Sequence, residues 1–593
     1  MKGLALAAVV LATAPLYADY TPFYLGLLTE VLVFGLFALA YDVLLGNTGV
    51  LSLGHSAFLG VAAYTTGIML GRLRLPLELS VLAGALGGLL TALIVGTLVL
   101  RKRGVYLAML TLALSQIFYY VVLMWTPVTG GTDGLGNLPI LHLSEPLGLR
   151  LSKRPITRYY VVVTVIFASV LVIRHILRSP LGRAMRAVKA NERRAEACGY
   201  NTRRVKLAAF LISGFFSGLA GALLTVVLEF VPIENIHWPV SGTVLIMALF
   251  GGTGTLLGPF VGAGVFVWMR DFLSKYLEYW EVFVGGAFVL IVLFFPEGIV
   301  GTALRLLQQR RGAPEAAAET APAAGEPVTP PRATPADGAT LLQTIGLTKV
   351  FGGLTAVNRV DFIVRRGELR AVIGPNGAGK TTFFNVLTGV LPASQGRILL
   401  NGRDVTRLPA HEVSRLGVAR SYQVTNIFSD LSVFENIRIA AQSRVTQYRC
   451  WGNADRLASV NTQTEEMLRL LGLGAKRHAR AAELSHGEQR YLEIGIALAT
   501  DPEFLLLDEP TAGMNSSEAR SLMALFQELI GKYVKAMLLI EHNMRVVMGI
   551  SHRVHVLDYG EKIAEGRPEE VRRDPRVIEA YLGQGSWAEH AQS

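Results

Sequence analysis

One short run of residues has the composition and spacing of a phosphate-binding loop. Residues 374–381 read Gly-Pro-Asn-Gly-Ala-Gly-Lys-Thr, a complete G-x-x-x-x-G-K-[ST] pattern. Glycines at these positions let backbone N–H groups wrap phosphate oxygens at a helix N-terminus. The pattern requires a strand before it and a helix after it, and we predict a strand at residues 369–373 and a helix from Lys380. By itself the loop indicates a nucleoside triphosphatase of unspecified class.

A second apolar strand ends in a pair of carboxylates. Residues 504–510 read Phe-Leu-Leu-Leu-Asp-Glu-Pro. Asp508 suits the ligand shell of Mg²⁺, directly or through water, and Glu509 is placed to polarise an attacking water. We therefore predict an ATP and Mg²⁺ site in which Lys380 reaches the β- and γ-phosphates and Thr381 holds the metal.

Three further motifs accompany the loop and the carboxylate pair. Residues 484–490 read Leu-Ser-His-Gly-Glu-Gln-Arg, residues 421–423 read Ser-Tyr-Gln, and residues 540–542 read Ile-Glu-His at the end of an apolar strand. In this order and spacing the motifs resemble the ATPase domain of ABC transporters, over about residues 341–585. Each motif alone has a structural explanation, but the set together is specific.

The resemblance implies a role for each motif residue. Phe351 resembles the aromatic residue that stacks on adenine, and Gln423 the residue that senses Mg²⁺ and the attacking water. His542 resembles the switch histidine on the γ-phosphate. Ser485 and Gly487 resemble signature residues that contact the γ-phosphate of an ATP held by an opposite subunit.

These assignments define the candidate site. The catalytic residues are predicted to be Glu509, His542 and Gln423. The metal-binding residues are predicted to be Thr381, Gln423 and Asp508. The ATP-contacting residues are predicted to be Phe351, Gly374, Pro375, Asn376, Gly377, Ala378, Gly379, Lys380, Thr381, Thr382, Ser485 and Gly487.

The signature region departs from the usual ABC pattern. His486 and Glu488 stand where Gly and Gln are usual, and Asn515 stands where an aspartate is usual. The serine hydroxyl and the second glycine N–H remain, so we expect ATP hydrolysis. The changes bear on communication between subunits rather than on the chemistry.

The same departures and several other motifs point to one subfamily. Residues 565–568 (Glu-Gly-Arg-Pro) and 580–583 (Ala-Tyr-Leu-Gly) are similar to the tail of branched-chain amino-acid importer ATPases. Residues 129–134 (Thr-Gly-Gly-Thr-Asp-Gly), 180–184 (Pro-Leu-Gly-Arg-Ala) and 295–298 (Phe-Pro-Glu-Gly) are similar to the permease subunits of the same importers. The resemblance thus extends to both halves of the chain.

The first half of the chain is dominated by apolar runs of membrane-spanning length, about 20 residues each. We predict spans near residues 3–18, 23–45, 50–70, 78–100, 105–127, 158–177, 206–231 and 281–303. Residues 240–270 must cross an even number of times if the ATP-handling half is cytoplasmic. We predict two short helices there, turning at the glycines of residues 251–254.

Charged residues orient these spans. Basic residues at 101–103 and 183–206 mark cytoplasmic loops by the positive-inside rule. The second of these loops is similar to the coupling helix by which importer permeases dock onto their ATPases; plain positive-inside charge is the alternative explanation. Glu30 and Asp42 lie near predicted span ends, where we expect interfacial solvation.

Composition and patterning set the domain organisation. We predict an all-α polytopic transmembrane domain at residues 1–305, an Ala/Pro/Glu-rich linker at 306–340 and an α/β P-loop ATPase domain at 341–593. Residues 1–18 are read as a retained helix, with a cleaved signal peptide as the alternative. The net charge of +11 belongs to loops beside apolar segments, which argues against nucleic acid as a partner. The two cysteines lie far apart in sequence, which argues against a disulfide or cysteine metal site.

The resemblance implies an ATP-hydrolysing importer of branched-chain or related amino acids in the cytoplasmic (inner) membrane, surrounded by membrane lipid. With one phosphate loop and one signature, the chain is half of a transporter. We expect as partners a second permease and a second ABC ATPase, or an identical copy, together with an external solute-binding protein. Import of urea or short amides is the alternative, and an ABC exporter half is a further one.

Overall fold

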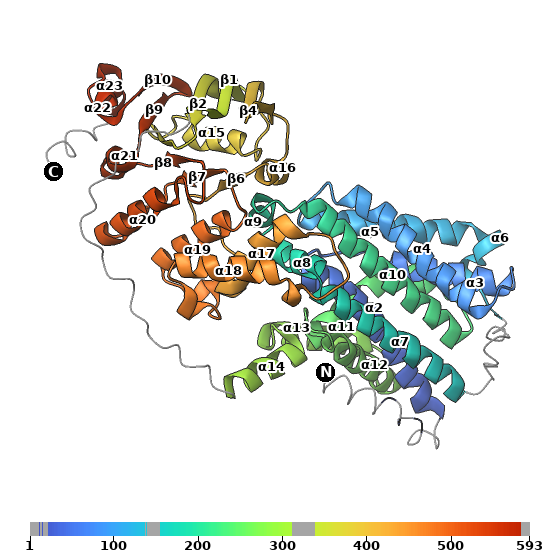
Figure 1. Ribbon diagram of the computed structural model, residues 1–593. Helices are drawn as coiled ribbons and strands as arrows, with labels where there is room; N and C mark the ends of the chain where they lie inside the picture. The colour runs from blue at the N-terminus through green and yellow to red at the C-terminus, as the bar shows by residue number, and fades with distance from the viewer. Residues whose placement is uncertain are drawn as a thin grey trace. The chain divides into compact units, whose positions relative to one another are not determined.

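The computed structural model describes residues 22–136, 138, 155–310 and 338–582, with the isolated positions 11, 13 and 15 (Figure 1). The chain forms two compact units. Two short segments belong to the unit opposite to the one that their place in the sequence suggests. Residues 190–202, which follow helices of the first unit, belong to the second unit, and residues 450–452 belong to the first.

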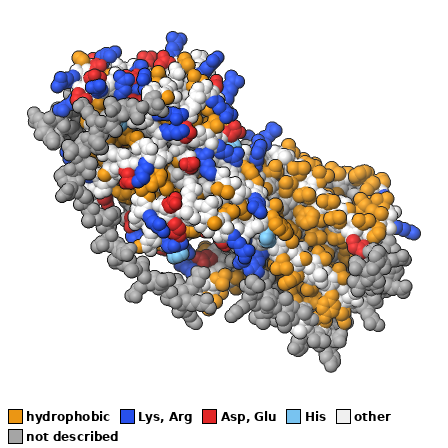
Figure 2. Space-filling view, viewed as in Figure 1, with side chains coloured by type: hydrophobic (Ala, Val, Ile, Leu, Met, Phe, Trp, Pro, Cys, Tyr) orange, Lys and Arg blue, Asp and Glu red, His pale blue; other side chains and the backbone are white. Residues whose placement is uncertain are grey.

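The regular elements of the first unit are helices throughout its described residues. They are α2 (Pro22–Thr48), α3 (His55–Gly71), α4 (Leu77–Val99), α5 (Val105–Met124), α6 (Thr126–Thr129), η1 (Gly131–Asp133), α7 (Pro155–Arg178), α8 (Pro180–Ala190), α10 (Thr202–Leu228), η3 (Ile233–Ile236), α11 (Trp238–Gly251), α12 (Gly258–Tyr276), α13 (Trp280–Phe294) and α14 (Gly298–Arg310). Figure 2 shows hydrophobic side chains crowding the visible face of this unit, as expected for a surface that meets lipid.

Six helices among the described residues are long and apolar enough to cross a membrane. The last of these candidates covers α13 and most of α14, which residues 295–297 separate. The span predicted near residues 50–70 is the 17-residue helix α3, which is too short to be counted among the six. The predicted span at 3–18 and most of the predicted linker lie outside the described residues.

The region of residues 240–270 forms two helices, α11 and α12, as predicted from parity. Glycines let the pair approach closely: a Cβ on Gly262 would lie 1.8 Å from the Met247 carbonyl oxygen. The same device joins α4 to α10, where a Cβ on Gly88 would lie 2.6 Å from the Gly214 carbonyl oxygen. Small residues therefore set the helix spacing here, and Gly214 with Gly218 and Gly258 with Gly262 each form the G-x-x-x-G pattern typical of closely packed membrane helices.

The prediction that Asp42 is solvated at a membrane interface is wrong. Its side chain is 1% exposed, and both carboxylate oxygens accept from the Gly254 N–H, at 3.0 and 2.9 Å. Gly254 has φ +78 in the loop between α11 and α12, where its N–H has no helical acceptor. A buried carboxylate needs such donors. Glu30 is half-buried and forms an ion pair with Arg270 at 2.8 Å.

The second unit is an α/β structure built on two sheets. The larger has six strands in the order β10-β9-β3-β8-β7-β6, and the smaller has four in the order β2-β1-β4-β5. The strands are β1 (Thr340–Phe351), β2 (Leu354–Arg365), β3 (Leu369–Ile373), β4 (Gln395–Leu400), β5 (Arg403–Asp404), β6 (Val418–Arg420), β7 (Phe504–Asp508), β8 (Ala536–Ile540), β9 (Arg553–Asp558) and β10 (Glu561–Gly566).

Helices surround these sheets. They are α9 (Glu192–Ala197), α15 (Lys380–Leu387), α16 (Ala410–Arg415), α17 (Val433–Val445), α18 (Ala458–Leu470), α19 (His486–Leu498), α20 (Ser516–Leu529), α21 (Met544–Ile550), α22 (Pro568–Val571) and α23 (Pro575–Leu582). In the larger sheet, β3, β7 and β8 are fully buried and parallel to their neighbours, which explains their unbroken apolar sequences. Parallel strands also bring their carboxyl ends to one edge, where the phosphate loop and the carboxylate pair begin.

Candidate functional site

The phosphate loop joins β3 to α15, in the strand–loop–helix context that the motif requires. At two of its glycines a side chain would overlap the neighbouring backbone. Gly374 has φ +153 and a Cβ there would lie 2.0 Å from the Leu557 carbonyl oxygen, while Gly379 has φ +90 and a Cβ would lie 2.2 Å from that of Ala356. At these positions the loop packs its backbone tightly against its surroundings and carries no side chain. Its backbone N–H groups are therefore available for phosphate oxygens.

Lys380 lies across its own loop. Its Nζ donates to the carbonyl oxygens of Gly374 and Pro375, at 2.7 and 2.9 Å. Burial lowers the pKa of Lys380, and the charges of Glu509 and Asp508 act in the opposite direction. The charges of the two carboxylates at the end of β7 thus partly offset the effect of burial on Lys380, whose predicted contact with the phosphates stays a prediction.

Asp508 ends β7 and is 1% exposed. One carboxylate oxygen accepts from Arg420 at 2.8 Å, and the other, Oδ1, is buried without a hydrogen-bond partner among the described residues. Burial raises the pKa of Asp508, and Arg420 opposes that rise. Arg420 was missed in the sequence analysis. Its position directly before Ser-Tyr-Gln, on a strand beside β7, is the signal that could have revealed it.

The three predicted catalytic residues meet at Glu509. Its carboxylate oxygens lie 3.0 Å from Gln423 Nε2 and 2.8 Å from His542 Nε2. The backbone of Glu509 has φ +48, a left-handed conformation that is unusual for a side chain of this size. Such strain persists where the surrounding fold imposes it and is typical of functional sites. Here it turns the carboxylate toward Gln423 and His542 directly after the buried strand.

The predicted signature residues lie at the start of α19. Ser485 is the N-cap of this helix, and the unusual Glu488 accepts from both the Ser485 N–H and Oγ at 3.0 Å. Glu488 also forms an ion pair with Lys476 at 2.6 Å. Its presence therefore has a structural reason, a capping box that anchors the signature serine.

Asn515 has a similar explanation. It is the N-cap of α20, and its Oδ1 accepts from the N–H groups of Ser517 and Glu518 at 3.0 and 2.9 Å. Asparagine caps helices about as well as aspartate does. The departure from the usual aspartate thus keeps the same helix start.

Two predicted ATP-contacting elements, the signature residues and Phe351, lie outside the phosphate loop and the carboxylate pair. Among the residues that the structure describes, no hydrogen bond or ion pair joins Ser485 or Gly487 to residues 374–382. Phe351, at the end of β1, is 43% exposed, and the Lys349 Nζ lies 4.9 Å from its ring centre. An exposed aromatic ring and an exposed helix N-terminus are surfaces that a nucleotide or a second cassette can still contact.

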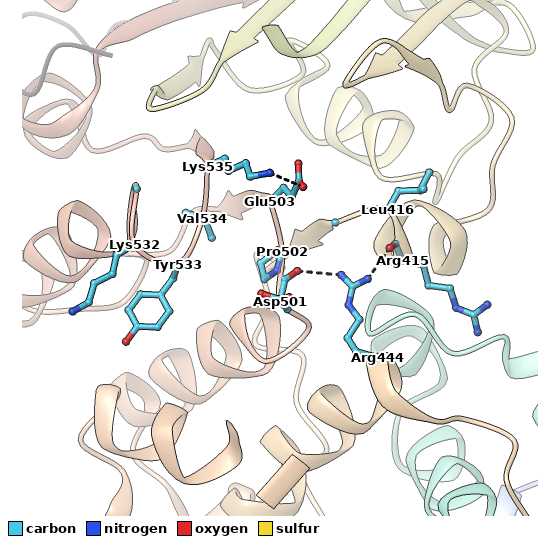
Figure 3. Close-up of a pocket in the computed structure, with 12 residues that line it drawn as sticks. Arg415, Leu416, Arg444, Asp501, Pro502, Glu503, Lys532, Tyr533, Val534 and Lys535 are labelled. Atoms are coloured by element: carbon cyan, nitrogen blue, oxygen red, sulfur yellow. Dashed lines mark hydrogen bonds and ion pairs between the residues drawn. The ribbon is translucent and has the colours of Figure 1, made fainter. Parts of the chain in front are cut away.

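A cavity of about 510 Å³ lies elsewhere in this unit (Figure 3). Its lining residues precede β6, β7 and β8, so it opens at the sheet edge opposite to the phosphate loop. Charged side chains in it are already satisfied: Lys535 pairs with Glu503 at 2.7 Å, and Arg444 donates to backbone carbonyls, including that of Arg415 at 2.7 Å. This cavity is therefore not the ATP site.

Comparisons with known proteins cover both halves of the chain. Residues 23–293 match the family of branched-chain amino acid transport system permease components. Residues 357–512 match the ABC transporter family, and residues 561–586 match the branched-chain amino acid ATP-binding cassette transporter family.

Individual relatives match part of the chain. The high-affinity branched-chain amino acid transport ATP-binding protein LivG of Salmonella typhimurium is 41% identical over 250 residues, covering 41% of this chain and 98% of that protein. BraF of Pseudomonas aeruginosa, with the same description, is 39% identical over 250 residues, with the same coverage. A crystal structure of a nucleotide-free ATP-binding cassette from an ABC transporter is similar at 31% identity and a TM-score of 0.37, covering 41% of this chain and 99% of that chain.

Proposed function

Because the chain belongs to the branched-chain amino-acid ABC transporters and joins a permease part to an ATP-hydrolysing cassette, we propose that it is half of an importer of branched-chain or related amino acids. The observation that carries the proposal is the convergence of Gln423 and His542 on Glu509 beside an intact phosphate loop. A chain with this cassette and a matching permease has both the energy source and the membrane path.

In the proposed reaction Glu509 accepts a proton from the water that attacks the γ-phosphate of ATP. Gln423 and His542 hold the carboxylate and the water in line, and Lys380 neutralises charge on the phosphates. Mg²⁺ fits the residues present, because the buried Asp508 Oδ1 has no hydrogen-bond partner in the part of the chain that the structure describes. The ion would be held by Thr381 and Asp508 and would offset phosphate charge. Preorganised donors and charges of this kind supply most of the catalysis in phosphoryl transfer.

The proposed assembly follows from the single phosphate loop and the single signature of the chain. No hydrogen bond or ion pair joins the signature serine to the phosphate loop among the described residues, which supports an ATP site that a second cassette completes. We propose a second permease and ATPase, or a second copy of this chain, in the cytoplasmic membrane with the cassettes on the cytoplasmic side. An external solute-binding protein would deliver the amino acid. ATP would favour the closed cassette pair, and hydrolysis would release it.

The test is uptake of labelled leucine by cells that carry the wild-type chain, a deletion, Glu509→Gln or Glu528→Gln. Glu528 is an exposed glutamate on α20, paired with Lys532 at 3.0 Å, and serves as the matched control. We expect uptake to be lost in the deletion and in Glu509→Gln, with ATP hydrolysis reduced about 100-fold or more, and to persist in Glu528→Gln.

Each other outcome contradicts one part of the proposal. Normal leucine uptake in the deletion strain, with loss of urea or amide uptake, would transfer the function to those solutes. Normal ATP hydrolysis by Glu509→Gln would remove Glu509 from the role of catalytic base.

A further inference from the structure

The two carboxylate oxygens of Asp508 have different surroundings. Oδ2 accepts from a terminal amino group of Arg420 at 2.8 Å. Oδ1 has no hydrogen-bond partner among the described residues, although the side chain is 1% exposed. A buried polar atom of this kind is costly unless a ligand contacts it. One oxygen of Asp508 is therefore held by the protein, and the other is left for a ligand.

Arg420 connects Asp508 to the helix that begins at the phosphate loop. The arginine is the last residue of β6 and is 4% exposed. Its second terminal amino group donates to the Asn385 Oδ1 at 2.6 Å and to the Thr388 hydroxyl at 3.4 Å. Asn385 lies in α15, and Thr388 is the C-cap of that helix. One planar side chain therefore joins the end of β7 to the end of α15.

The partners of Arg420 on α15 lie on the same side of the helix as Thr381, the other residue proposed to hold Mg²⁺. Thr381, Asn385 and Thr388 follow one another at intervals of four and three residues. Such intervals place side chains on one face of a helix at successive turns. Asn385 lies roughly 6 Å further along the helix axis than Thr381. Arg420 thus holds Asp508 against the face of α15 that carries Thr381.

Two aromatic rings restrict the guanidinium further. The Arg420 Cζ lies 4.9 Å from the centre of the Tyr422 ring and 5.7 Å from the centre of the Phe384 ring. Rings at these distances attract a cation. Because a guanidinium is planar and forked, it binds Asp508 and Asn385 at the same time, whereas an ammonium group is a compact point charge. The arrangement therefore requires an arginine and not only a positive charge.

We propose that Arg420 is a positioning residue for Mg²⁺: it holds Asp508 by one oxygen and ties it to α15, so that the other oxygen of Asp508 and the hydroxyl of Thr381 keep a fixed separation around the ion. The inference rests on the proposed function in that it takes Asp508 and Thr381 as the residues that hold Mg²⁺. It goes beyond that function because it assigns the arrangement of the metal site to a residue that contacts neither the ion nor the nucleotide.

The first test measures binding of AMP-PNP, an ATP analogue that is not hydrolysed, to the full-length chain purified with its co-purifying subunits and reconstituted in lipid nanodiscs. Binding is measured with Mg²⁺ and with EDTA for wild type, Arg420→Lys and Asn385→Ala. Both variants keep a positive charge beside Asp508 and lose the connection to α15. We expect the affinity in Mg²⁺ to fall about 10-fold in each variant, as is typical when the residue behind a metal ligand is lost, and the affinity in EDTA to stay within about twofold of wild type.

Arg438→Lys is the matched control. Arg438, on α17, is also 4% exposed, pairs with Glu435 at 3.2 Å and Asp455 at 3.3 Å, and lies 5.4 Å from the centre of the Phe434 ring. We expect this control to lower the thermal midpoint of the metal-free protein about as much as Arg420→Lys does, because both remove a buried fork. Its affinity for AMP-PNP in Mg²⁺ should stay at the wild-type value.

Two results would reduce Arg420 to a structural role and overturn the proposal. One is an equal loss of affinity in Mg²⁺ and in EDTA for Arg420→Lys. The other is the same Mg²⁺-dependent loss in Arg438→Lys.

A double-mutant cycle tests the connection to α15 directly. We expect Arg420→Lys/Asn385→Ala to lose no more Mg²⁺-dependent affinity than either single variant, because both changes break the same connection. Losses that multiply would mean that the two residues act independently, and the proposed connection would fail.

The readout separates this inference from the proposed function. A wild-type chain that binds AMP-PNP equally in Mg²⁺ and in EDTA refutes the metal site assigned to Thr381 and Asp508, and the inference with it. Mg²⁺-dependent binding that Arg420→Lys and Asn385→Ala retain in full refutes the role of Arg420 alone. Neither result depends on which solute the chain transports, because no solute enters the measurement.

Discussion

The two segments that belong to the opposite unit, residues 190–202 and 450–452, differ in how they are held. Residues 190–202 are fixed in the ATPase unit by buried polar contacts: Arg194 to two carbonyl oxygens, and the Tyr200 hydroxyl to the Ile439 carbonyl oxygen at 2.8 Å. Residues 450–452 are held in the helical unit at the surface. There the Gly452 N–H donates to His175 Nε2 at 3.0 Å, and the Trp451 ring, 63% exposed, lies 4.3 Å from the His175 ring.

A segment that belongs to the unit opposite to its sequence neighbours is therefore not necessarily held tightly there. Buried hydrogen bonds to charged groups are costly to break, because each broken bond leaves an unsatisfied group away from water. An exposed ring contact loses little, since water replaces it. We therefore expect the segment 190–202 to stay in place in the ATPase unit, and the segment 450–452 to be held more weakly in the helical unit.

The largest expected contrast is in thiol reactivity, since each segment carries one of the two cysteines of the chain. Cys198 is buried and Cys450 is exposed, and burial raises the pKa of the Cys198 thiol, leaving less of the reactive thiolate at neutral pH. We expect a maleimide at pH 7 to label Cys450 on the order of 100-fold faster or more than Cys198.

Single-cysteine variants, with Cys198→Ser or Cys450→Ser, assign the two rates. Similar rates at both positions would mean that the segment 190–202 is open most of the time, and the comparison between the segments would collapse.

A smaller effect is expected when one buried hydrogen bond of the segment 190–202 is removed. Tyr200→Phe removes the buried hydroxyl that donates to the Ile439 carbonyl oxygen, at a cost of about 1–3 kcal/mol. The thermal midpoint of the ATPase unit in detergent, followed by calorimetry, should fall by several degrees. Tyr448→Phe, at a partly exposed tyrosine near the other segment, is the control and should change stability by less than about 0.5 kcal/mol.

The smallest effect is expected at the other segment. Trp451→Ala removes a ring contact at a mostly exposed site, and such pairs are worth about 0.5–1.5 kcal/mol when well packed, so the loss should lie at or below the lower end. Hydrogen exchange at the Gly452 amide should become faster while the ATPase rate stays at the wild-type value. A large loss of ATPase rate in this variant would contradict the expectation that the segment 450–452 is the more weakly held of the two.

Motifs that are contiguous in sequence supplied most of the candidate ATP site, and the roles of its residues stay predictions. The phosphate loop, the buried strand ending in Asp508 and Glu509, and His542 after its own strand are local patterns. Parallel strands then place their carboxyl ends together, so Glu509 and His542 meet as the resemblance implies. The pair of helices at residues 240–270 also followed from local composition, with parity as the added constraint.

The missed residues share a different property. Each contacts a partner that is distant in the sequence. Arg420 pairs with Asp508, Arg194 donates to the Glu493 carbonyl oxygen, and Asp42 accepts from the Gly254 N–H. Nothing in the local pattern of a charged residue distinguishes a solvated side chain from one that is buried against a distant donor or acceptor. The expectation of a solvated Asp42 failed for that reason.

The sequence by itself determined the class of this protein, because phosphate loops, carboxylate pairs and spanning helices depend on residue types at fixed local spacing. Only the tertiary structure decided which charges are buried and which segment belongs to which unit. Burial depends on what the rest of the chain brings to a position, and the cost of removing a charge from water makes its partners decisive. Arg194 illustrates both statements: its basic segment was recognised from sequence, while its place between β6 and α19 came from the fold.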